Sequence, residues 1–269
     1  MKTLSVIIPS RNGKSILQKY LPLIQAETLS CGGELVVVDD CSSDGTVEYL
    51  KVEYPTIRII ERKGDPAFCR AVNLGMAESV GSFLLLLNND TIPGKGSFGS
   101  LLLRLQEEKK ATAAAVPSIP RPDGTDDSLF SVGTHRGLAV TGEHVSGVPY
   151  PSGACALWRR TAWEELDGFD CRYAPIYWED ADMGLRMIKA GFSMVRCPDI
   201  TVRHMHASTM GSSLETAVLQ ERNRFIFMDT HHSARWRLWL PLHLFFAVLK
   251  GNRAFTKGYH AFSKWRRER

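Results

Sequence analysis

The chain has no Cys-x-x-Cys pair, although six cysteines stand at positions 31, 41, 69, 155, 171 and 197. Zinc ribbons place cysteine ligands at that short spacing, so a zinc site of this kind is not expected. The first residues run directly into an apolar strand pattern, without the charged, apolar and small-residue regions of a signal peptide. We therefore expect a cytoplasmic protein with reduced thiols.

Glycine-rich phosphate-binding loops are also missing after the first two strands. Neither of these loops has the motif G-x-G-x-x-G, and the P-loop motif G-x-x-x-x-G-K-[ST] does not occur in the chain, which disfavours ordinary Rossmann cofactor enzymes and P-loop ATPases. The sequence contains no internal repeat and no low-complexity tract. Its formal net charge of +4 is too small to indicate a nucleic-acid partner.

Long apolar runs are scarce as well. The longest, residues 238–249, is interrupted by Pro241 and His243 and is shorter than the roughly 20 residues of a spanning helix. Residues 235–269 carry nine cationic side chains against the single acid Glu268. We therefore expect residues 231–269 to form a basic, amphipathic helical segment. It either lies on an anionic membrane surface, as in a peripheral enzyme at the cytoplasmic face, or packs on the protein itself or a second subunit.

Composition and periodicity predict an α/β fold. The chain has 269 residues, of which 44% are hydrophobic and 23% charged, as in soluble globular proteins with a sizeable core. Apolar strand patterns alternate with helical patterns, which predicts a parallel sheet covered by helices on both faces. The expected strands are 4–8, ended by Pro9, then 34–38, 56–60 and 82–87, and the expected helices are 15–25, 46–52, 67–79 and 98–109.

The middle of the chain has a different composition. Residues 117–151 are rich in Gly, Pro, Asp and Thr and show little periodicity. A stretch of that length is either a functional loop region or a small hairpin layer. Helical patterns return at 160–166 and 180–190, and residues 200–203 resemble a strand.

Two acidic clusters carry the strongest indication of chemistry. Asn88-Asn89-Asp90 follows the apolar run 83–87, and Glu179-Asp180-Ala181-Asp182 follows the aromatic-rich stretch 173–178. A carboxylate at the end of a buried strand lies at the sheet edge where open α/β folds bind ligands. If the second cluster folds back to that edge, a metal-binding carboxylate and a general base share one cleft. The structural alternatives are that Asp180 or Asp182 caps a helix, or that Asp182 pairs with Arg186.

The loops after the first two strands are a second indication. Residues 9–13 and 39–46 each follow a buried strand and precede a helix, so their N–H groups and polar side chains face one crevice. Asp40 is the stronger functional candidate there, because two adjacent acids end a buried strand. Ser43 and Asp44 are as well explained as helix N-caps.

Five segments occur in an order that identifies a family. Residues 5–12, 36–46, 70–75, 86–90 and 178–183 together resemble the family-two glycosyltransferases, and more narrowly their bacterial rhamnosyltransferase-type members, over residues 4–228. The resemblance implies a GT-A-type, Rossmann-like, mostly parallel sheet flanked by helices, with a C-terminal helical extension. It implies a domain over 1–230, with a nucleotide-binding half at 1–110 and an acceptor and catalytic half at 111–230.

The resemblance also implies roles for single residues. Asp40 reads the nucleotide base, and Asp90 binds a divalent ion, Mg²⁺ or Mn²⁺, assisted by His204 in preference to His206. Asn88 departs from the family's usual Asp-x-Asp motif, which puts metal dependence in question. The full set implied for the nucleotide is Pro9, Ser10, Arg11, Asn12, Asp39, Asp40, Arg70, Asn73, Asn88 and Asn89.

Asp180 is the implied general base, with Glu179 beside it, for a single displacement that inverts the anomeric carbon. Gly153, Ala154 and Trp178 are implied on the acceptor side. The donor is a dTDP-, UDP- or GDP-linked sugar, and the acceptor is a glycan or a lipid-linked glycan in cell-surface polysaccharide synthesis.

Two alternatives remain at this stage. A non-catalytic nucleotide-sugar-binding protein is disfavoured because binding alone needs no base. A sugar nucleotidyltransferase is disfavoured because residues 10–14 match its glycine-rich loop poorly.

Overall fold

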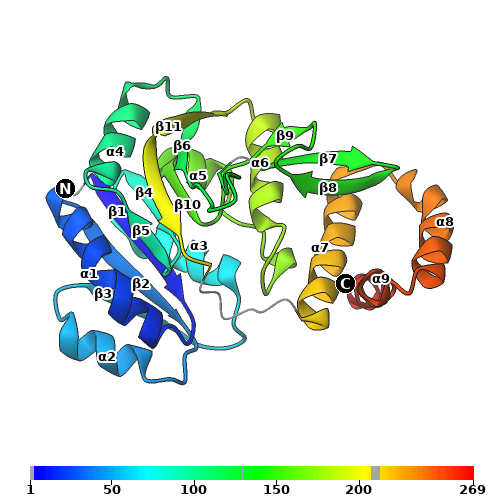
Figure 1. Cartoon of the computed structure of the whole chain (residues 1–269), viewed down its shortest axis with the longest axis horizontal. Helices are drawn as coiled ribbons and strands as arrows, with labels where there is room; N and C mark the ends of the chain where they lie inside the picture. Colours follow the sequence, from blue (N-terminus) through cyan, green and yellow to red (C-terminus); the bar gives the residue numbers. More distant parts are fainter. Residues whose placement is uncertain (1–2, 129, 207–212) are drawn as a thin grey trace.

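A computed structural model describes residues 3–128, 130–206 and 213–269. Its centre is an eight-stranded sheet (Figure 1). From one edge to the other the strands are β3 (Arg58–Arg62), β2 (Glu34–Asp40), β1 (Leu4–Ser10), β4 (Phe83–Leu87), β10 (Cys155–Arg159), β6 (Thr112–Ser118), β11 (Ser193–His204) and β5 (Thr91–Pro93).

The sheet is mostly parallel, as the sequence predicts. Strands β3, β2, β1 and β4 run parallel, β10 is antiparallel to both its neighbours, β11 is parallel to β6, and β5 is antiparallel to β11. The expectation that Pro9 ends the first strand is wrong, because β1 continues to Ser10. Pro9 pairs only with Val38 of β2, and the pairing of β1 with β4 stops at Ile7. A residue without an N–H is tolerated where one side of the strand is unpaired.

Helices cover both faces of the sheet. Residues along β1 alternate between them: Val6 and Ile8 belong to the hydrophobic cluster beneath one set of helices, and Ile7 to the cluster beneath the other. The first set comprises α1 (Lys14–Ser30), α2 (Thr46–Glu53) and α4 (Ser97–Glu107), and the second comprises α3 (Phe68–Glu78), α5 (Arg160–Glu165) and α6 (Glu179–Lys189). Helix α3 packs so closely that a Cβ at Gly75 would lie 2.6 Å from Ile7 Cγ2.

A smaller sheet lies beside the first. Residues 117–151 contain β7 (Ser131–His135), β8 (Leu138–Gly142) and β9 (Val148–Pro149), in the order β8-β7-β9. This confirms the hairpin-layer alternative for that stretch. After it come the 3₁₀ turn η1 (Cys171–Tyr173) and helix α6.

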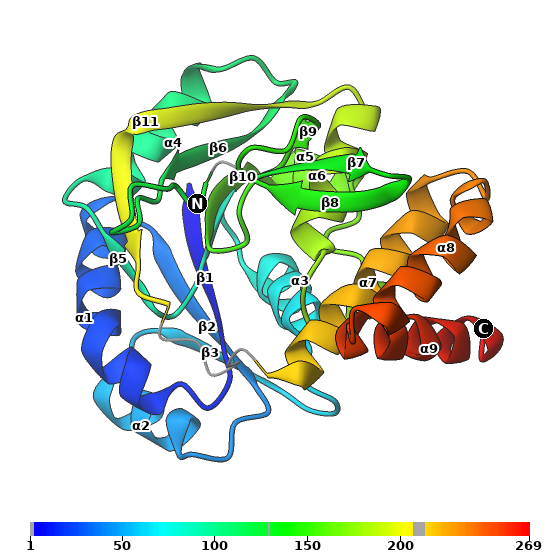
Figure 2. The ribbon, with the colours of Figure 1, turned by 45° about the vertical axis from the view of Figure 1, so that its right-hand side comes forward.

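Three helices complete the described chain: α7 (Leu214–His231), α8 (Trp236–Leu249) and α9 (Arg253–Arg267). Figure 2 shows α7 between the sheets and the α8–α9 pair. Phe225 of α7 packs on Trp236, Phe255 and Phe262, so one face of the pair packs on the protein itself. Within the described ranges, none of the helices has the length and apolarity needed to cross a bilayer.

Candidate functional site

Two adjoining cavities lie at the carboxyl ends of the central strands. The first, of about 220 Å³, is bounded by the end of β1, by the loop after β4 and by the start of α3. The second, of about 620 Å³, is bounded by β8, by the start of α6 and by α7. Phe68 and Ile176 line both cavities. A molecule filling the first would therefore present one end to the second.

The first cavity gathers most of the residues predicted for the nucleotide. Its lining includes Pro9, Ser10, Arg11, Asp40, Asn88, Asn89 and Asp90. Asn89 Nδ2 donates to Ser10 Oγ at 2.9 Å and so ties the loop after β4 to the end of β1.

Asn12 holds two loops together beside this cavity. Its N–H donates to Ser42 Oγ at 2.8 Å, and its Oδ1 accepts from the Ser43 N–H at 2.8 Å. Its φ of 48° is in the left-handed region, which asparagine tolerates better than most residues. These contacts make Asn12 a positioning residue for the loops after β1 and β2.

The paired acids at the end of β2 have different surroundings. Asp40 lines the cavity, and its carboxylate accepts from Arg62 Nε at 2.6 Å and from the Ala67 N–H at 2.7 Å. Asp39 accepts from the Ser42 N–H at 3.0 Å, while its buried Oδ1 has no hydrogen-bond partner among the described residues.

Four predicted nucleotide residues lie outside both cavities: Asn12 and Asp39, described above, and Asn73 and Arg70. The side-chain amide of Asn73 donates to the carbonyl of Phe169 at 2.8 Å and accepts from the N–H of the same residue at 2.9 Å. Both its polar atoms are thereby committed to holding α3 against the loop before η1. Arg70, on the same helix, is exposed and is absent from the lining of either cavity.

A group of carboxylates and imidazoles lies where the cavities meet. His204, at the end of β11, has Nε2 3.1 Å from Asp90 Oδ1 and Nδ1 3.3 Å from Asp127 Oδ2. His206 Nε2 is 2.8 Å from the same Asp127 oxygen. Asp127, His204 and His206 offer ligand atoms close enough together to hold a metal ion. This arrangement does not distinguish His204 from His206 as the metal-binding histidine.

The two carboxylates beside His204 determine its protonation. Burial by itself would favour neutral His204, but its hydrogen bonds to Asp127 and Asp90 outweigh burial and raise its pKa to about 9. Asp127 was missed by sequence reasoning. It lies in the stretch without periodicity, and the fold alone brings it to His204, 77 residues further along the chain.

The second acidic cluster begins α6 and borders the second cavity. Asp180 is partly exposed, and burial raises the pKa of its carboxyl to about 6 although the N–H groups of Ala181 and Gly153 act in the opposite direction. Glu179 is buried, and burial together with the neighbouring Asp180 raises the pKa of Glu179 well above its usual value. Its Oε2 has no hydrogen-bond partner within the part of the chain that the structure describes. Two neighbouring acids thus have different protonation behaviour.

The residues predicted for the acceptor side surround Asp180. Gly153, Ala154 and Trp178 all line the second cavity. A Cβ at Gly153 would lie 3.9 Å from Asp180 Oδ2, so the small side chain leaves space beside the carboxylate. The Trp178 ring also packs on Phe227, with ring centroids 5.1 Å apart.

The loop before α6 is held from α7. Tyr177 and Trp178 have φ angles of 80° and 77°, which cost energy in residues other than glycine. Buried Asn223 compensates by donating its side-chain amide to the carbonyls of Tyr173, Ile176 and Tyr177, at 2.6 to 2.9 Å. The loop before α6 therefore depends on a helix that follows it by some forty residues.

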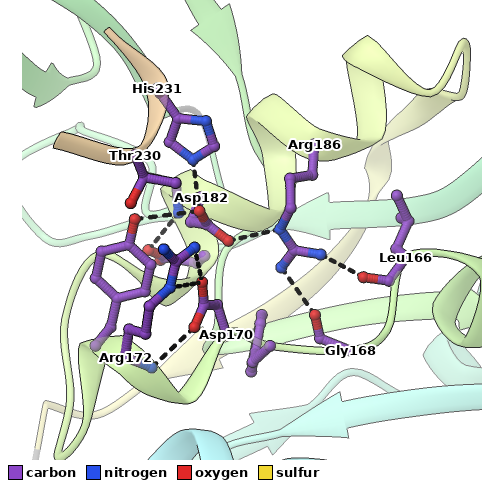
Figure 3. Close-up of polar contacts among 12 residues, drawn as sticks. Leu166, Gly168, Asp170, Arg172, Asp182, Arg186, Thr230 and His231 are labelled. Carbon is purple, nitrogen blue, oxygen red and sulfur yellow. Dashed lines mark hydrogen bonds and ion pairs between the residues drawn. The ribbon is translucent and has the colours of Figure 1, made fainter. Parts of the chain in front are cut away.

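Asp182 is a structural anchor, as the pairing alternative predicts. Figure 3 shows its fully buried carboxylate between Arg186, whose Nε is 2.7 Å away, and His231, whose Nε2 is 2.6 Å away. Burial opposes its ionisation, but the bond to His231 and the charge of Arg186 outweigh burial and hold the pKa of Asp182 below its usual value. Arg186 in turn donates to the carbonyl of Gly168. This network fixes α6 to α7.

Sequence comparisons place these features among known proteins. The family model described as glycosyltransferase-like family 2 matches residues 2–227. The chain is 29% identical over 269 residues to the N-acetylglucosaminyl-diphospho-decaprenol L-rhamnosyltransferase of Mycobacterium tuberculosis strain H37Rv, an alignment covering 87% of this chain and 85% of that protein. It is 25% identical over 218 residues to an O-antigen chain rhamnosyltransferase of Salmonella anatum, covering 78% and 68%.

Solved structures show a similar fold. A mannosyltransferase from Pyrobaculum calidifontis, in complex with GDP-Man and Mn²⁺, has a TM-score of 0.62 at 17% identity, covering 97% of this chain and 74% of that one. Staphylococcus aureus TarS, in complex with UDP-GlcNAc, has a TM-score of 0.59 at 16% identity, covering 84% and 66%.

Proposed function

Because this chain belongs to glycosyltransferase-like family 2 and has the predicted GT-A-type fold, we propose that it is an inverting glycosyltransferase using Asp180 as general base. Glycosyltransferase activity in cell-surface polysaccharide synthesis follows from the family and the rhamnosyltransferase relatives. The proposed donor is a nucleoside-diphosphate sugar, with a dTDP-linked sugar tested first because of those relatives and UDP- and GDP-linked sugars next.

The proposal rests on the position of Asp180. It lines the second cavity, which Phe68 and Ile176 separate from the first. The first cavity holds the side chains expected for the nucleotide, and the second holds Asp180 beside the space left by Gly153. A donor bound in the first cavity directs its sugar past Phe68 and Ile176 toward the second. The acceptor hydroxyl then enters from the opposite side, which is the geometry of a single displacement.

The chemistry assigned to Asp180 fits its surroundings. With a pKa of about 6 the carboxyl is largely ionised at neutral pH and can accept a proton. In the proposed step the acceptor oxygen bonds to the anomeric carbon, its proton passes to Asp180, and the bond from that carbon to the diphosphate oxygen breaks. The nucleoside diphosphate leaves on the side of the first cavity. Burial and the neighbouring Asp180 raise the pKa of Glu179 well above its usual value, and Glu179 is proposed to position the start of α6 next to the base.

The leaving diphosphate needs its charge neutralised, and the residues present fit a divalent cation. Asp90 and Asp127 are buried carboxylates on either side of His204, so oxygen and nitrogen donors meet at the boundary of the cavities. We assign Asp90 and His204 as the residues that would hold Mg²⁺ or Mn²⁺. When bound, such an ion acts as a Lewis acid on the diphosphate oxygens. Asp127 orients His204 from its other ring nitrogen.

The acceptor is proposed to be a glycan or lipid-linked glycan, used at the cytoplasmic face of a membrane by a peripherally bound enzyme. The support is that one relative is named for a decaprenol-linked substrate and that the C-terminal segment is strongly basic.

Thermal shift tests the donor site directly. UDP, dTDP and GDP, with CMP as the control, are compared with and without Mg²⁺ or Mn²⁺, because a ligand that binds only the folded state raises the melting temperature. The expected result is stabilisation by one nucleoside diphosphate that increases with metal. Transfer is then measured with the matching sugar nucleotide. Absence of a shift with all three diphosphates would refute the donor-site assignment.

A further inference from the structure

Helix α8 has two apolar faces, and only one of them is covered. Trp236, Leu240 and Ala247 recur at helical spacing and are buried against the protein. On the other side Leu238, Leu242, Phe245 and Leu249 recur at spacings of four, three and four, with exposed fractions of 78, 48, 57 and 65%. Exposed Trp239, Phe246 and Val248 extend this surface. A helix that is apolar all round is ordinarily buried or in contact with lipid.

The next helix carries a row of basic side chains. Arg253, Lys257, His260, Lys264 and Arg267 recur along α9 at spacings of four, three, four and three, and all five are exposed. The opposite side of α9 packs inward through Phe255 and Phe262. We call the outward apolar side chains of α8 together with this row the α8–α9 surface. Figure 1 shows α8 at the edge of the molecule farthest from β3.

The charge of this segment differs from that of the rest of the chain. Residues 235–269 contain nine of the 33 cationic side chains but only one of the 29 acids, so they carry +8 while residues 1–234 carry −4. No Asp or Glu occurs between residues 230 and 267. A hollow of about 370 Å³ between α8 and α9 is lined by Arg237, Arg266 and Arg267, of which Arg237 and Arg266 pair with Asp229 of α7.

We propose that the α8–α9 surface docks on an anionic lipid bilayer, with the apolar side of α8 inserted among the acyl chains and the cations of α9 at the headgroups. Apolar side chains bordered by Lys and Arg, without acids, are the composition of helices that lie in a membrane interface. Headgroup phosphates neutralise the +8 charge, since each cation near an anionic leaflet contributes to binding. A second copy is the less favourable occupant, because docking through α8 would bring two segments of +8 together.

The β7–β8 hairpin connects the docking surface to the second cavity. His243 Nε2 of α8 lies 2.8 Å from the carbonyl oxygen of Arg136, and a Cβ at Gly137 would lie 3.4 Å from Trp239 Cδ1. Both contacts are at the turn between β7 and β8. Further along β8, Val140 and Thr141 line the cavity that holds Asp180. Four residues of strand span about 13 Å, so an acceptor still attached to its lipid can reach the cavity from the bilayer surface. This last step rests on the proposed function, whereas docking itself does not.

Vesicle flotation tests the docking without any sugar nucleotide. The full chain is mixed with phosphatidylcholine vesicles that contain or lack phosphatidylglycerol. We expect flotation with the anionic vesicles and little with the neutral ones. The variant Leu242→Glu/Phe245→Glu should bind the anionic vesicles about tenfold more weakly or worse, because two charges replace inserted apolar side chains. The matched control is Val52→Glu/Leu103→Glu, which changes two side chains that are 73 and 62% exposed on α2 and α4 and should float like the original chain.

Two results would overturn the proposal. One is equal flotation of the α8 variant and the control, given that thermal melting shows both to be folded. The other is a chain that does not float and that sedimentation shows to be a dimer, which the α8 variant converts to a monomer. Sugar transfer is measured in a separate assay. The α8 variant should still use a water-soluble acceptor analogue but lose transfer to a polyprenyl-linked acceptor in vesicles. If neither the original chain nor any variant transfers sugar to the soluble acceptor, the proposed function is refuted. The flotation result would still support docking.

Discussion

The rate of transfer should follow the ionisation of Asp180. A general base acts only when ionised, so activity is present above its pKa and is lost as pH falls through about 6. With that value the ionised fraction falls by about tenfold between pH 7 and pH 5. We therefore expect kcat/KM to fall by about tenfold over the same interval, measured with saturating metal and a soluble acceptor.

Replacing Asp180 by Asn removes the base and keeps the size of the side chain. The expected loss in kcat is about 10²- to 10⁴-fold, the usual contribution of a positioned base. That loss corresponds to roughly 3 to 5 kcal/mol of transition-state stabilisation. Binding of the nucleoside diphosphate should persist, because the first cavity does not include this residue.

Folding of the Asp180→Asn variant can be separated from catalysis. The raised pKa means that ionised Asp180 costs stability above pH 6, so losing the charge should not lower the melting temperature at pH 7. Asp199→Asn is the matched control, since Asp199 is exposed and pairs with Arg104 at the surface. Near-normal turnover by Asp180→Asn, or a rate independent of pH between 5 and 7 in the unaltered enzyme, would refute the assignment.

Three other substitutions test the site. Asp182→Ala should cost about 3 to 5 kcal/mol, because it leaves the buried hydroxyl of Tyr173 and the buried imidazole of His231 without their partner and removes the ion pair of Arg186. It should lower Tm by about 5 to 9 °C. Since the pKa of Asp182 is depressed, its contribution to stability is also lost as pH falls, and an unchanged melting curve would contradict the anchor. Asp90→Ala should abolish the metal-dependent part of nucleotide affinity, and titrations that are identical with and without chelator in the unaltered chain would remove its metal role. Asn73→Ala should cost about 1 to 3 kcal/mol of stability, because the backbone of Phe169 loses both partners. A large loss of nucleotide affinity without loss of stability would instead support the role that family resemblance implies.

Buried strands and the polar loops that follow them were predictable because their evidence is local. The apolar runs of β1, β2 and β4 and the polar residues after them are contiguous in sequence. Strand β6 and helix α7 were not predicted. The sequence of β6 contains three consecutive alanines and ends in Pro-Ser, which weakens its strand propensity, and its pairing with β10 and β11 decides its conformation. Helix α7 has little amphipathic periodicity because different sides of it pack on α6, β8 and α9.

The residues of the site likewise differ in whether local sequence or long-range contacts identify them. Asp90 and Asp180 were found because each belongs to a short motif. Asp127 had no such motif, and only the path of the chain beside β11 brings it to His204. Asn73 illustrates the opposite case: its place in a motif predicted contact with the nucleotide, whereas the fold commits its amide to Phe169. Roles that depend on long-range partners cannot be deduced from spacing along one sequence.

The hydrogen bonds of Asn223 and His231 limit how far the chain can be shortened at its C-terminal end. A chain shortened to residue 230, the predicted domain boundary, would retain every residue that lines the two cavities. It would nevertheless lose the imidazole that holds Asp182, and α7 would lose the aromatic side chains of α8 and α9 that pack on Phe225. We expect Asn223 then to hold the loop before α6 less firmly in its strained conformation. The smallest stable unit that contains both cavities is therefore expected to include helices that line neither of them.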